Sequence, residues 1–572
     1  MDPVARRHWQ ARAATDPGSV RALAEALGLS PLSARILLGR GLGEIAAARH
    51  FLAARLAALP DPLLLSNMDQ AARRLAQAVR GQEEIVVHGD YDVDGITGAA
   101  LLVESLRALG AQVDFHIPLR LRDGYGLSAA ALRDAQAQGK RLVVSVDCGI
   151  SALDEARLAR ELGLDLIITD HHQPPEQLPP ALALINPHLP GDKFPEKHLA
   201  GVGVAFFLLL AVRRQLRDEG WFAARPEPDL RLMLDFVALG TIADIVPLTG
   251  VNRILVRAGL DLLAQDRRPG LAALRQIAGV REVTCGAVGF QLAPRLNAAG
   301  RLEDAALAVR LLLTRDAEKA RDIARQLDEC NRERQSIEAE TFDQALERLD
   351  ALDQPWRRSI VLADERWHPG VIGIVASRLV ERFHRPTLLI ALDKGRGKGS
   401  GRSIRGLHLY QALSACGDRL LGFGGHEYAA GLSIAAEELD NFTEQFEALA
   451  CAALTEDDLL PQLLHDGVVD LAAFAQADVA ELAALAPFGP GNPEPLFRVN
   501  GAVFERPRCV GRDHLQFQLR QEDVSLPCIA FGAAARWQGI NGWVDVLCTP
   551  QINRWQGRES VQLRVKDLRE NG

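Results

Sequence analysis

One histidine and three aspartates follow directly on an apolar segment in the stretch 86–95. It reads Val-Val-His-Gly-Asp-Tyr-Asp-Val-Asp-Gly. Its β-branched residues predict a buried strand, its two glycines a tight turn, and the apolar spacing over 96–109 an amphipathic helix. In α/β proteins the carboxyl ends of the strands hold the ligands, and carboxylates gathered beside a buried strand require a cation. Oxygen donors with one imidazole suit Mn²⁺ or Mg²⁺ better than a thiolate-preferring metal.

The same stretch begins like the calcium loop of an EF-hand. Such a loop needs a bidentate glutamate at its twelfth position and a helix before it. Counted from Asp90, the twelfth residue is Leu101, and the residues before the loop are typical of a strand. We therefore set the calcium loop aside. A solvated acidic turn is the plainer alternative, and it would need no partner residues elsewhere in the chain.

Strands and helices alternate from residue 84 onward. Helical segments separate several of the strands that the sequence predicts, and this alternation favours a mostly parallel sheet with crossover helices, hence an α/β domain. The predicted strands cover residues 85–88, 113–117, 142–147, 165–169 and 181–185.

Further candidate ligands lie at the ends of other apolar segments. Asp147 ends Val-Ser-Val-Asp, Asp170-His171-His172 follows Ile-Ile-Thr, and Asp244 lies in Leu-Gly-Thr-Ile-Ala-Asp-Ile-Val-Pro-Leu. Taken singly, Asp147 could cap a helix, Asp244 could cap a turn, and a histidine could simply be packed. We expect all of them at strand ends of one domain, where they would form one site.

These residues resemble the motifs of the DHH phosphoesterase family, which are His-x-x-x-Asp-x-Asp, an isolated aspartate, Asp-His-His and a later aspartate. From about residue 36 the chain resembles the single-strand-specific exonuclease branch of that family. The stretches Pro-Leu-Arg with Gly-Tyr-Gly, Ala-Pro-Arg-Leu-Asn-Ala-Ala-Gly-Arg, Trp-His-Pro-Gly-Val-Ile-Gly and Gly-Gly-His-Glu-Tyr-Ala-Ala-Gly carry the resemblance, at 118–126, 293–301, 367–373 and 424–431. Leu119 departs from it, because the family often has a polar residue there.

The resemblance implies two divalent ions, Mn²⁺ or Mg²⁺, that act together on a phosphodiester. The ligands of one ion would be His88, Asp92 and Asp147. The ligands of the other would be Asp94, Asp147, His171 and Asp244, so that Asp147 bridges the pair. Asp90, Asp170 and His172 would orient these ligands or contact phosphate. We expect Asp147, His172 and Asp90 to be catalytic.

The resemblance also implies a site that holds the 5′-terminal phosphate of the substrate. Residues 394–405 form the most basic stretch of the chain, with a glycine at every second position from Gly395 to Gly401. We interpret it as a loop whose amides and cations approach phosphate; a solvated loop is the alternative. For Arg295 and Arg301 the sequence does not decide between phosphate binding and a structural role. The expected substrate-binding residues are Arg120, Arg295, Arg301, Ser400, Arg402 and His426.

We expect six regions along the chain. Region 1–80 would be helical, with plain helical packing favoured over a helix-turn-helix at 20–42. Region 491–572 has 11 Lys/Arg against 9 Asp/Glu and seven aromatic residues, which fits an OB-like β-barrel that stacks nucleobases. Between them we expect a DHH catalytic domain (81–313), a long connecting helix (314–350), a second α/β domain of DHHA1 type (351–455) and a linker (456–490).

Composition narrows the class of protein. The net charge of −9 excludes a surface uniformly coated for nucleic acid, so any such surface must be local. Eight scattered cysteines without a Cys-x-x-Cys pair predict neither a zinc site nor a disulfide framework. The longest apolar run, 202–212, is too short to span a membrane. We expect a soluble, cytoplasmic monomer.

Three functions agree with such a site. The resemblance implies a 5′→3′ exonuclease that releases 5′-mononucleotides from single-stranded DNA in recombination and repair, working with a helicase and single-strand-binding protein. The second is a phosphodiesterase or pyrophosphatase for small phosphates, but such enzymes lack an OB domain. The third is a non-catalytic DNA-binding factor like the degenerate DHH proteins of eukaryotic replication forks, which have lost ligands that are all present here. We favour the exonuclease.

Overall fold

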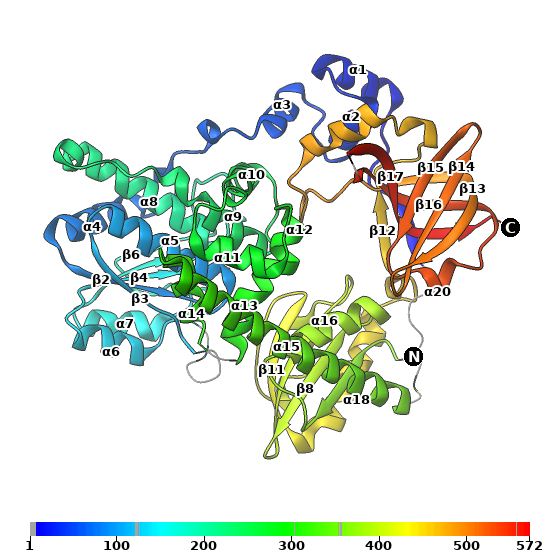
Figure 1. Cartoon of the computed structure of the whole chain (residues 1–572). Coiled ribbons are helices and arrows are strands. Elements are labelled where there is room, and N and C mark those ends of the chain that lie inside the picture. Colours follow the sequence, from blue (N-terminus) through cyan, green and yellow to red (C-terminus); the bar gives the residue numbers. More distant parts are fainter. Residues whose placement is uncertain are drawn as a thin grey trace. The chain divides into compact units, whose positions relative to one another are not determined.

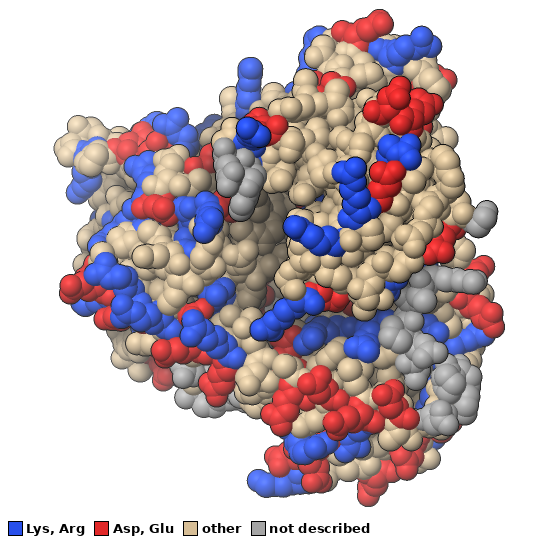
Figure 2. All heavy atoms as spheres, turned by 45° about the vertical axis from the view of Figure 1, so that its right-hand side comes forward, with Lys and Arg blue, Asp and Glu red and all other residues tan. Residues whose placement is uncertain are grey.

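The computed structural model describes residues 7–119, 124, 126–302, 304–352, 354, 357–555 and 557–571. The chain divides into two compact units (Figure 1). The large unit comprises Ala11–Leu327 with Leu464–Gly572, and the small unit comprises Met1–Gln10 with Asp328–Leu463. Lys/Arg and Asp/Glu side chains are interspersed over the face drawn in Figure 2.

The first sheet of the large unit is entirely parallel, in the order β3-β2-β4-β5-β6. All five carboxyl ends therefore meet at one edge, and the prediction of a mostly parallel sheet is confirmed. The strands are β2 (Glu84–Gly89), β3 (Gln112–His116), β4 (Leu142–Val146), β5 (Asp165–Thr169) and β6 (Ala183–Ile185).

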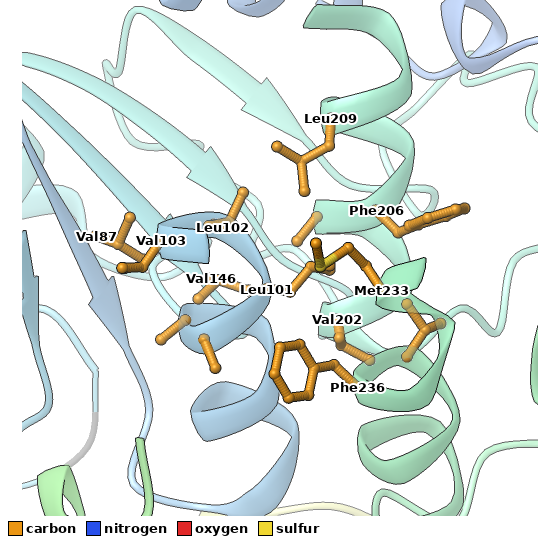
Figure 3. Close-up of a cluster of buried hydrophobic side chains, with 14 of the residues drawn as sticks. Val87, Leu101, Leu102, Val103, Val146, Val202, Phe206, Leu209, Met233 and Phe236 are labelled. Carbon is orange, nitrogen blue, oxygen red and sulfur yellow. The ribbon is translucent and has the colours of Figure 1, made fainter. Parts of the chain in front are cut away.

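Helices cover both faces of this sheet (Figure 1), which is why the inner strands β4 and β5 are almost wholly apolar. The edge strand β3 instead alternates polar and apolar residues. On one face, Val87 of the sheet lies beside Val103 of α5, and Val202 and Phe206 of α8 lie on the other side of α5 (Figure 3). The helices of this face are α4 (Met68–Gly81), α5 (Val93–Ala108) and α8 (Gly201–Asp218), with α9 (Leu234–Ala243) packed on α5 and α8. Those of the other face are α6 (Ala129–Ala137) and α7 (Leu153–Glu161).

A series of helices continues the large unit after α9. One of them contains a π-helical turn, η5, between α12 and α13. The expected long helix is present as α15, a helix of 36 residues, or about 54 Å at 1.5 Å per residue. The series is α10 (Gly250–Leu263), α11 (Pro269–Ala278), α12 (Cys285–Ala287), η5 (Val288–Leu292), α13 (Ala293–Leu302), α14 (Ala306–Leu313) and α15 (Ala317–Leu352).

The C-terminal part of the large unit is a closed barrel in the order β13-β14-β15-β17-β16, so the predicted OB-like barrel is confirmed. Its core is shared with the N-terminal helices through Leu23, Ile36 and Leu37, which favours plain helical packing there. Leu471 and Leu485, in the expected linker, are buried in the same core. The elements are α1 (Pro17–Leu27), α2 (Pro31–Gly39), α3 (Ile45–Ala53), α19 (Gln476–Glu481), η10 (Leu482–Leu485), β13 (Phe497–Val510), β14 (His514–Gln521), β15 (Val524–Ala530), α20 (Ala534–Trp537), β16 (Gly542–Trp555) and β17 (Arg558–Glu570).

The small unit holds a mixed sheet in the order β10-β11-β9-β8-β7. Only the β7–β8 pair is parallel in the described ladder. The helices α15 and α16 pack on one face, and α17 and α18 on the other. The elements are β7 (Ile360–Asp364), α16 (Ile372–Phe383), β8 (Thr387–Asp393), β9 (Arg396–Arg402), α17 (Leu409–Ala415), β10 (Leu420–Gly425), β11 (Ala429–Ala435) and α18 (Leu439–Ala453). A further short strand, β12 (Gln462–His465), pairs with β1 (His8–Ala11).

The interpretation of residues 394–405 as a phosphate-cradling loop is wrong. Most of the stretch is strand β9, whose backbone pairs with β8 and β11. Its glycines allow close packing instead: a Cβ at Gly397 would lie 2.5 Å from Ile390, and one at Gly399 would lie 2.7 Å from Leu432. The basic side chains alternate with these glycines and project from the opposite face.

Among the described residues, no single helix has both the length and the apolarity to cross a bilayer; α1 and α2 meet that test only as a bent pair.

Candidate active site

Three aspartates lie side by side at the carboxyl edge of the parallel sheet. The ladder pairs Gly89 with Val146 and Val146 with Thr169, the last residues of β2, β4 and β5. Asp90, Asp147 and Asp170 each come directly after one of these residues. Parallel pairing in this register therefore gathers the three carboxylates on neighbouring strands, as their positions after apolar segments predicted.

Two more carboxylates come from the beginning of α5. Asp92 is the N-cap, and its Oδ1 accepts a hydrogen bond from the Gly95 amide at 3.1 Å. Asp94 is buried and accepts hydrogen bonds from the amides of Gly201 at 2.6 Å and Val202 at 2.8 Å. Those amides begin α8, and the positive end of a helix dipole stabilises a carboxylate there. We had not predicted this role for the Gly-Val-Gly-Val sequence at the start of the apolar run.

Asp244 reaches the site from a helix. It was expected at a strand end, and this expectation is wrong: Asp244 is the C-cap residue of α9. Gly240 lets α9 approach closely, because a Cβ there would lie 2.8 Å from Val202 and 2.9 Å from Asp94 Oδ1. The helix is apolar on all sides because it is buried on all sides, so its sequence lacks the periodicity that identifies a surface helix.

The imidazole of His171 lies among three of these carboxylates. Its Nε2 is 3.0 Å from Asp147 Oδ1, 3.6 Å from Asp244 Oδ2 and 3.8 Å from Asp94 Oδ2. This buried nitrogen makes no hydrogen bond within the described structure. Ligand atoms of Asp94, His171 and Asp244 lie within 4.8 Å of one another, the spacing at which one ion can bind all three. Three of the four donors expected for the second ion thus form one cluster, and the fourth, Asp147, lies 3.0 Å from His171.

The donors for the first expected ion are arranged differently. Asp92 and Asp147 have atoms within 4.8 Å of each other, and the third member of that cluster is Asp90. The Nε2 of His88 instead lies 3.0 Å from the carbonyl of Gly126. The three-residue clusters found in the described structure do not include His88. The role of His88 as a ligand of this ion stays a prediction, and the geometry adds Asp90 as a second candidate.

Burial and mutual repulsion favour the neutral form of the carboxyl groups. Burial, and to a smaller extent the charge of the neighbouring Asp92, raises the pKa of Asp94 to about 7. Burial, and to a smaller extent the charge of Asp94, raises the pKa of Asp244 to about 9 and that of Asp147 well above its usual range. Burial also lowers the pKa of His171 to about 3, so its imidazole is neutral. Crowded buried carboxylates with a neutral imidazole fit a divalent cation, which offsets their repulsion.

Asp170 and His172 form a separate hydrogen-bonded pair. Asp170 Oδ1 accepts from His172 Nδ1 at 2.7 Å and from the amides of His171 and His172, and Oδ2 accepts from the Ile150 amide at 2.9 Å. Burial disfavours the imidazolium of His172, but the hydrogen bond to Asp170 and the negative charges of Asp170, Asp244 and Asp92 together outweigh burial and raise the pKa of His172 to about 9. His172 is therefore a cation near neutral pH beside the cluster of carboxyl groups.

The expected substrate-binding residues fall in both units. Arg120 lies outside the described residues. Arg295 and Arg301 belong to α13 in the large unit, where Arg295 Nη1 donates to the carbonyl of Gln291 at 2.6 Å. A Cβ at Gly300 would lie 2.6 Å from the carbonyl oxygen of Tyr91, so this end of α13 packs on the stretch 90–94, which carries three of the candidate ligands.

Ser400, Arg402 and His426 are brought together in the small unit. Ala429 pairs with Arg402 in the sheet, and its carbonyl accepts from the His426 amide at 2.8 Å. The side chains of Ser400 and Arg402 lie beside the first turn of α16: a Cβ at Gly373 would lie 2.8 Å from Ser400 Oγ and 3.3 Å from Arg402 Nη2. A hydroxyl and a guanidinium beside a helix N-terminus suit an anion.

Three family models match the chain. They are the DHH family N-terminal domain over residues 84–241, the DHHA1 domain over 358–451 and the RecJ OB domain over 465–567. These matches, with the two five-stranded sheets and the closed barrel, agree with the predicted fold class.

Curated relatives and solved structures give the same result. The single-stranded-DNA-specific exonuclease RecJ of Bacillus subtilis is 41% identical over 562 residues, which cover 96% of this chain and 70% of that protein. The RecJ exonuclease of Escherichia coli is 40% identical over 522 residues, covering 88% of this chain and 90% of that protein. A crystal structure of Thermus thermophilus RecJ in complex with Mn²⁺ superposes with a TM-score of 0.85 at 34% identity, covering 99% of this chain and 80% of that one.

Proposed function

The chain belongs to the RecJ family of DHH-domain proteins, and on this premise we propose that it is a single-strand-specific DNA exonuclease that uses two divalent metal ions. The observation that carries the proposal is the position of His171 Nε2 within 3.8 Å of carboxylate oxygens from Asp94, Asp147 and Asp244. Relatives bound to Mn²⁺ and to Mg²⁺ have been solved, which supports the same ions for this chain.

The residues divide into ligands and supporting groups. Asp94, Asp147, His171 and Asp244 would hold one ion, and Asp92 and Asp147, with His88 or Asp90, would hold the other. When bound, the ions lower the pKa of the attacking water and neutralise charge on the phosphodiester. The amides at the start of α8 hold Asp94 in place.

His172 and Asp170 supply a fixed positive charge at this site. Because Asp170 keeps the pKa of His172 at about 9, the imidazolium would donate an N–H hydrogen bond to a phosphate oxygen. Such charge-assisted hydrogen bonds are roughly twice as strong as neutral ones. Asp170 thereby also fixes the orientation of the ring.

The polarity of digestion would be set in the small unit. Ser400, Arg402 and His426, beside the start of α16, would bind a terminal 5′-phosphate, so that hydrolysis proceeds 5′→3′ and releases 5′-mononucleotides. Arg295, Arg301 and Arg120 would add cations along the substrate. The half-buried guanidinium of Arg402 next to a helix N-terminus supports this assignment.

The barrel would bind the single strand beyond the site. Its match to the RecJ OB domain supports this role, as do two exposed aromatic side chains, Phe531 at 58% and Trp543 at 59% exposure. Exposed aromatic rings on an OB barrel stack nucleobases with little sequence preference.

We further propose that the enzyme works in the cytoplasm as a monomer, with a helicase and single-strand-binding protein, in recombination and repair.

The proposal is tested by digesting single-stranded DNA that carries a label at either end, with Mn²⁺, Mg²⁺ or EDTA. We expect metal-dependent release of labelled mononucleotide from the 5′ end, and no digestion of the matching duplex. Hydrolysis of small phosphodiesters alone would favour the small-phosphate enzyme, and DNA binding without hydrolysis would favour the non-catalytic factor. Either result would overturn the proposal.

A further inference from the structure

Two large apolar side chains next to the candidate metal ligands project into solvent. Ile245, which follows Asp244 directly, is 70% exposed, and Phe290, in η5, is 86% exposed. Phe290 is the most exposed large apolar side chain of the described structure. Neither contributes to the core, so packing does not explain them.

Both residues also lie in irregular backbone. Ile245 has φ +62°, a left-handed conformation that is a genuine outlier for a β-branched residue. Phe290 lies in a π-helical turn, a rare feature that occurs frequently at functional sites. Within that turn Val288 and Leu292 are fully buried, and Phe290 points the other way. Strain of this kind persists where the surrounding structure imposes it, and it clusters at ligand-binding sites.

The helical segment that carries Phe290 runs along the candidate metal ligands. A Cβ at Gly289 would lie 3.8 Å from Ile242, two residues before Asp244. Further along, Gly300 packs against the carbonyl of Tyr91, between Asp90 and Asp92. The segment 285–302 thus contacts two of the sequence stretches that supply carboxylates, the stretch 90–94 and the end of α9, and Phe290 lies next to the residue that contacts α9.

We propose that Phe290 and Ile245 form an apolar platform that binds the nucleobase of a nucleotide flanking the scissile phosphate. This inference rests on the proposed exonuclease function. A phosphate gains nothing from such a surface, whereas an unpaired base presents a π-face that stacks on an aromatic ring. In a duplex that face is already stacked on its neighbours, so the platform would also help to select single strands.

The test uses single-turnover cleavage of 5′-phosphorylated oligothymidylate by the full chain with Mn²⁺. One substrate is unmodified, and two others carry an abasic tetrahydrofuran at one or the other nucleotide flanking the scissile phosphate. For the wild type, we expect one of the abasic substrates to react on the order of 5- to 100-fold more slowly, the effect of one lost stacking contact. Phe290→Ala should slow the unmodified substrate by a similar factor and lose all sensitivity to the abasic position. Phe290→Trp should retain both the rate and the sensitivity.

Leu63→Ala is the matched control, because Leu63 is also an exposed apolar residue. It lies two residues after Asp61, which contacts Arg214 in the second half of α8, whereas the site lies at the beginning of that helix. It should behave like the wild type. Ile245→Asn, which suits a positive φ, should raise the melting temperature yet slow cleavage.

If Phe290→Ala cleaves the unmodified substrate at the wild-type rate, or keeps its sensitivity to the abasic position, the platform does not contact the base, and a protein partner becomes the alternative occupant. Failure of the proposed function is distinguishable, because the wild type would then not degrade the unmodified strand at all.

Discussion

A Cβ atom at Gly201 would lie 2.7 Å from the Cβ of Asp147. The first turn of α8 therefore presses directly on the proposed bridging ligand, whose own backbone has φ +64°. The same turn holds Asp94 through the amides of Gly201 and Val202. One helix N-terminus thus positions two of the carboxylates.

Gly201→Ala should displace Asp147 and weaken metal binding. Overpacking a tight contact destabilises a protein by typically 1–3 kcal/mol, and here the shift acts on a shared ligand. We expect a lower Mn²⁺ affinity by calorimetry and a large loss of hydrolysis. Gly203→Ala, on the same helix, is the control, because a Cβ there meets only Leu199 at ordinary contact distance. Equal Mn²⁺ affinity in the two variants would contradict the account.

Mn²⁺ affinity should rise with pH. The pKa of Asp94, about 7, and that of Asp244, about 9, exceed the ordinary aspartate value of 3.8, so the metal-free folded protein holds extra protons. These two carboxyl groups therefore contribute to the stability of the metal-free protein at low pH, and this contribution is lost as the pH rises through their folded-state pKa values. A bound cation replaces the protons. The melting temperature in EDTA should fall as the pH rises, and the increase in melting temperature on adding Mn²⁺ should become larger. In Asp244→Asn both quantities should depend less on pH. A pH-independent gain would count against this coupling.

Arg402→Ala should reduce the preference for a 5′-phosphorylated strand over a 5′-hydroxyl strand. A lost charge-assisted hydrogen bond is worth roughly 1.5–3 kcal/mol, or on the order of 10- to 100-fold in relative kcat/KM. Arg396→Ala, at the exposed other end of β9, should leave the preference unchanged. If Arg402→Ala slows both strands by the same factor, Arg402 does not recognise the terminal phosphate.

Trp543→Ala should weaken binding to long single strands and leave short ones unaffected. Stacking of one base contributes roughly 1–3 kcal/mol, so we expect a loss on the order of 5- to 100-fold, measured by fluorescence anisotropy at fixed salt. A point substitution is preferable to removal of the barrel, because the barrel shares its core with α1 and α2 and truncation would expose that core. Ile45→Ala, exposed on α3, is the control. Unchanged affinity for a long strand would refute the stacking role.

The parts of the fold that sequence predicts are those with strong local signals. The strand at 165–169 is β5 with the same bounds, because β-branched apolar runs between turns have few alternatives. The helix ending at Asp244 lacked periodicity because it is wholly buried. Strand β9 looked like a loop because glycine is disfavoured in strands, and only the neighbouring Ile390 and Leu432 explain its presence.

The site shows the same division between local and long-range information. The candidate ligands could be proposed from the sequence because each is a charged or polar side chain that an apolar environment tolerates only beside a partner. The groups that hold them, such as the amides of Gly201 and Val202 for Asp94, have no side-chain chemistry and lie more than 100 residues away in the sequence. The sharing of one core by the N-terminal helices and the C-terminal barrel is also a long-range relationship that no local pattern encodes.

The central claim is that Asp147 bridges two metal ions. Anomalous diffraction at the manganese edge, from crystals of the full chain grown with Mn²⁺, tests it most directly. We predict two peaks about 3.5–4 Å apart, one beside Asp94, His171 and Asp244 and the other beside Asp92, with Asp147 in contact with both. Contact of the second peak with His88 or with Asp90 would identify its remaining ligand. A single peak, or two peaks of which one does not contact Asp147, would contradict the account.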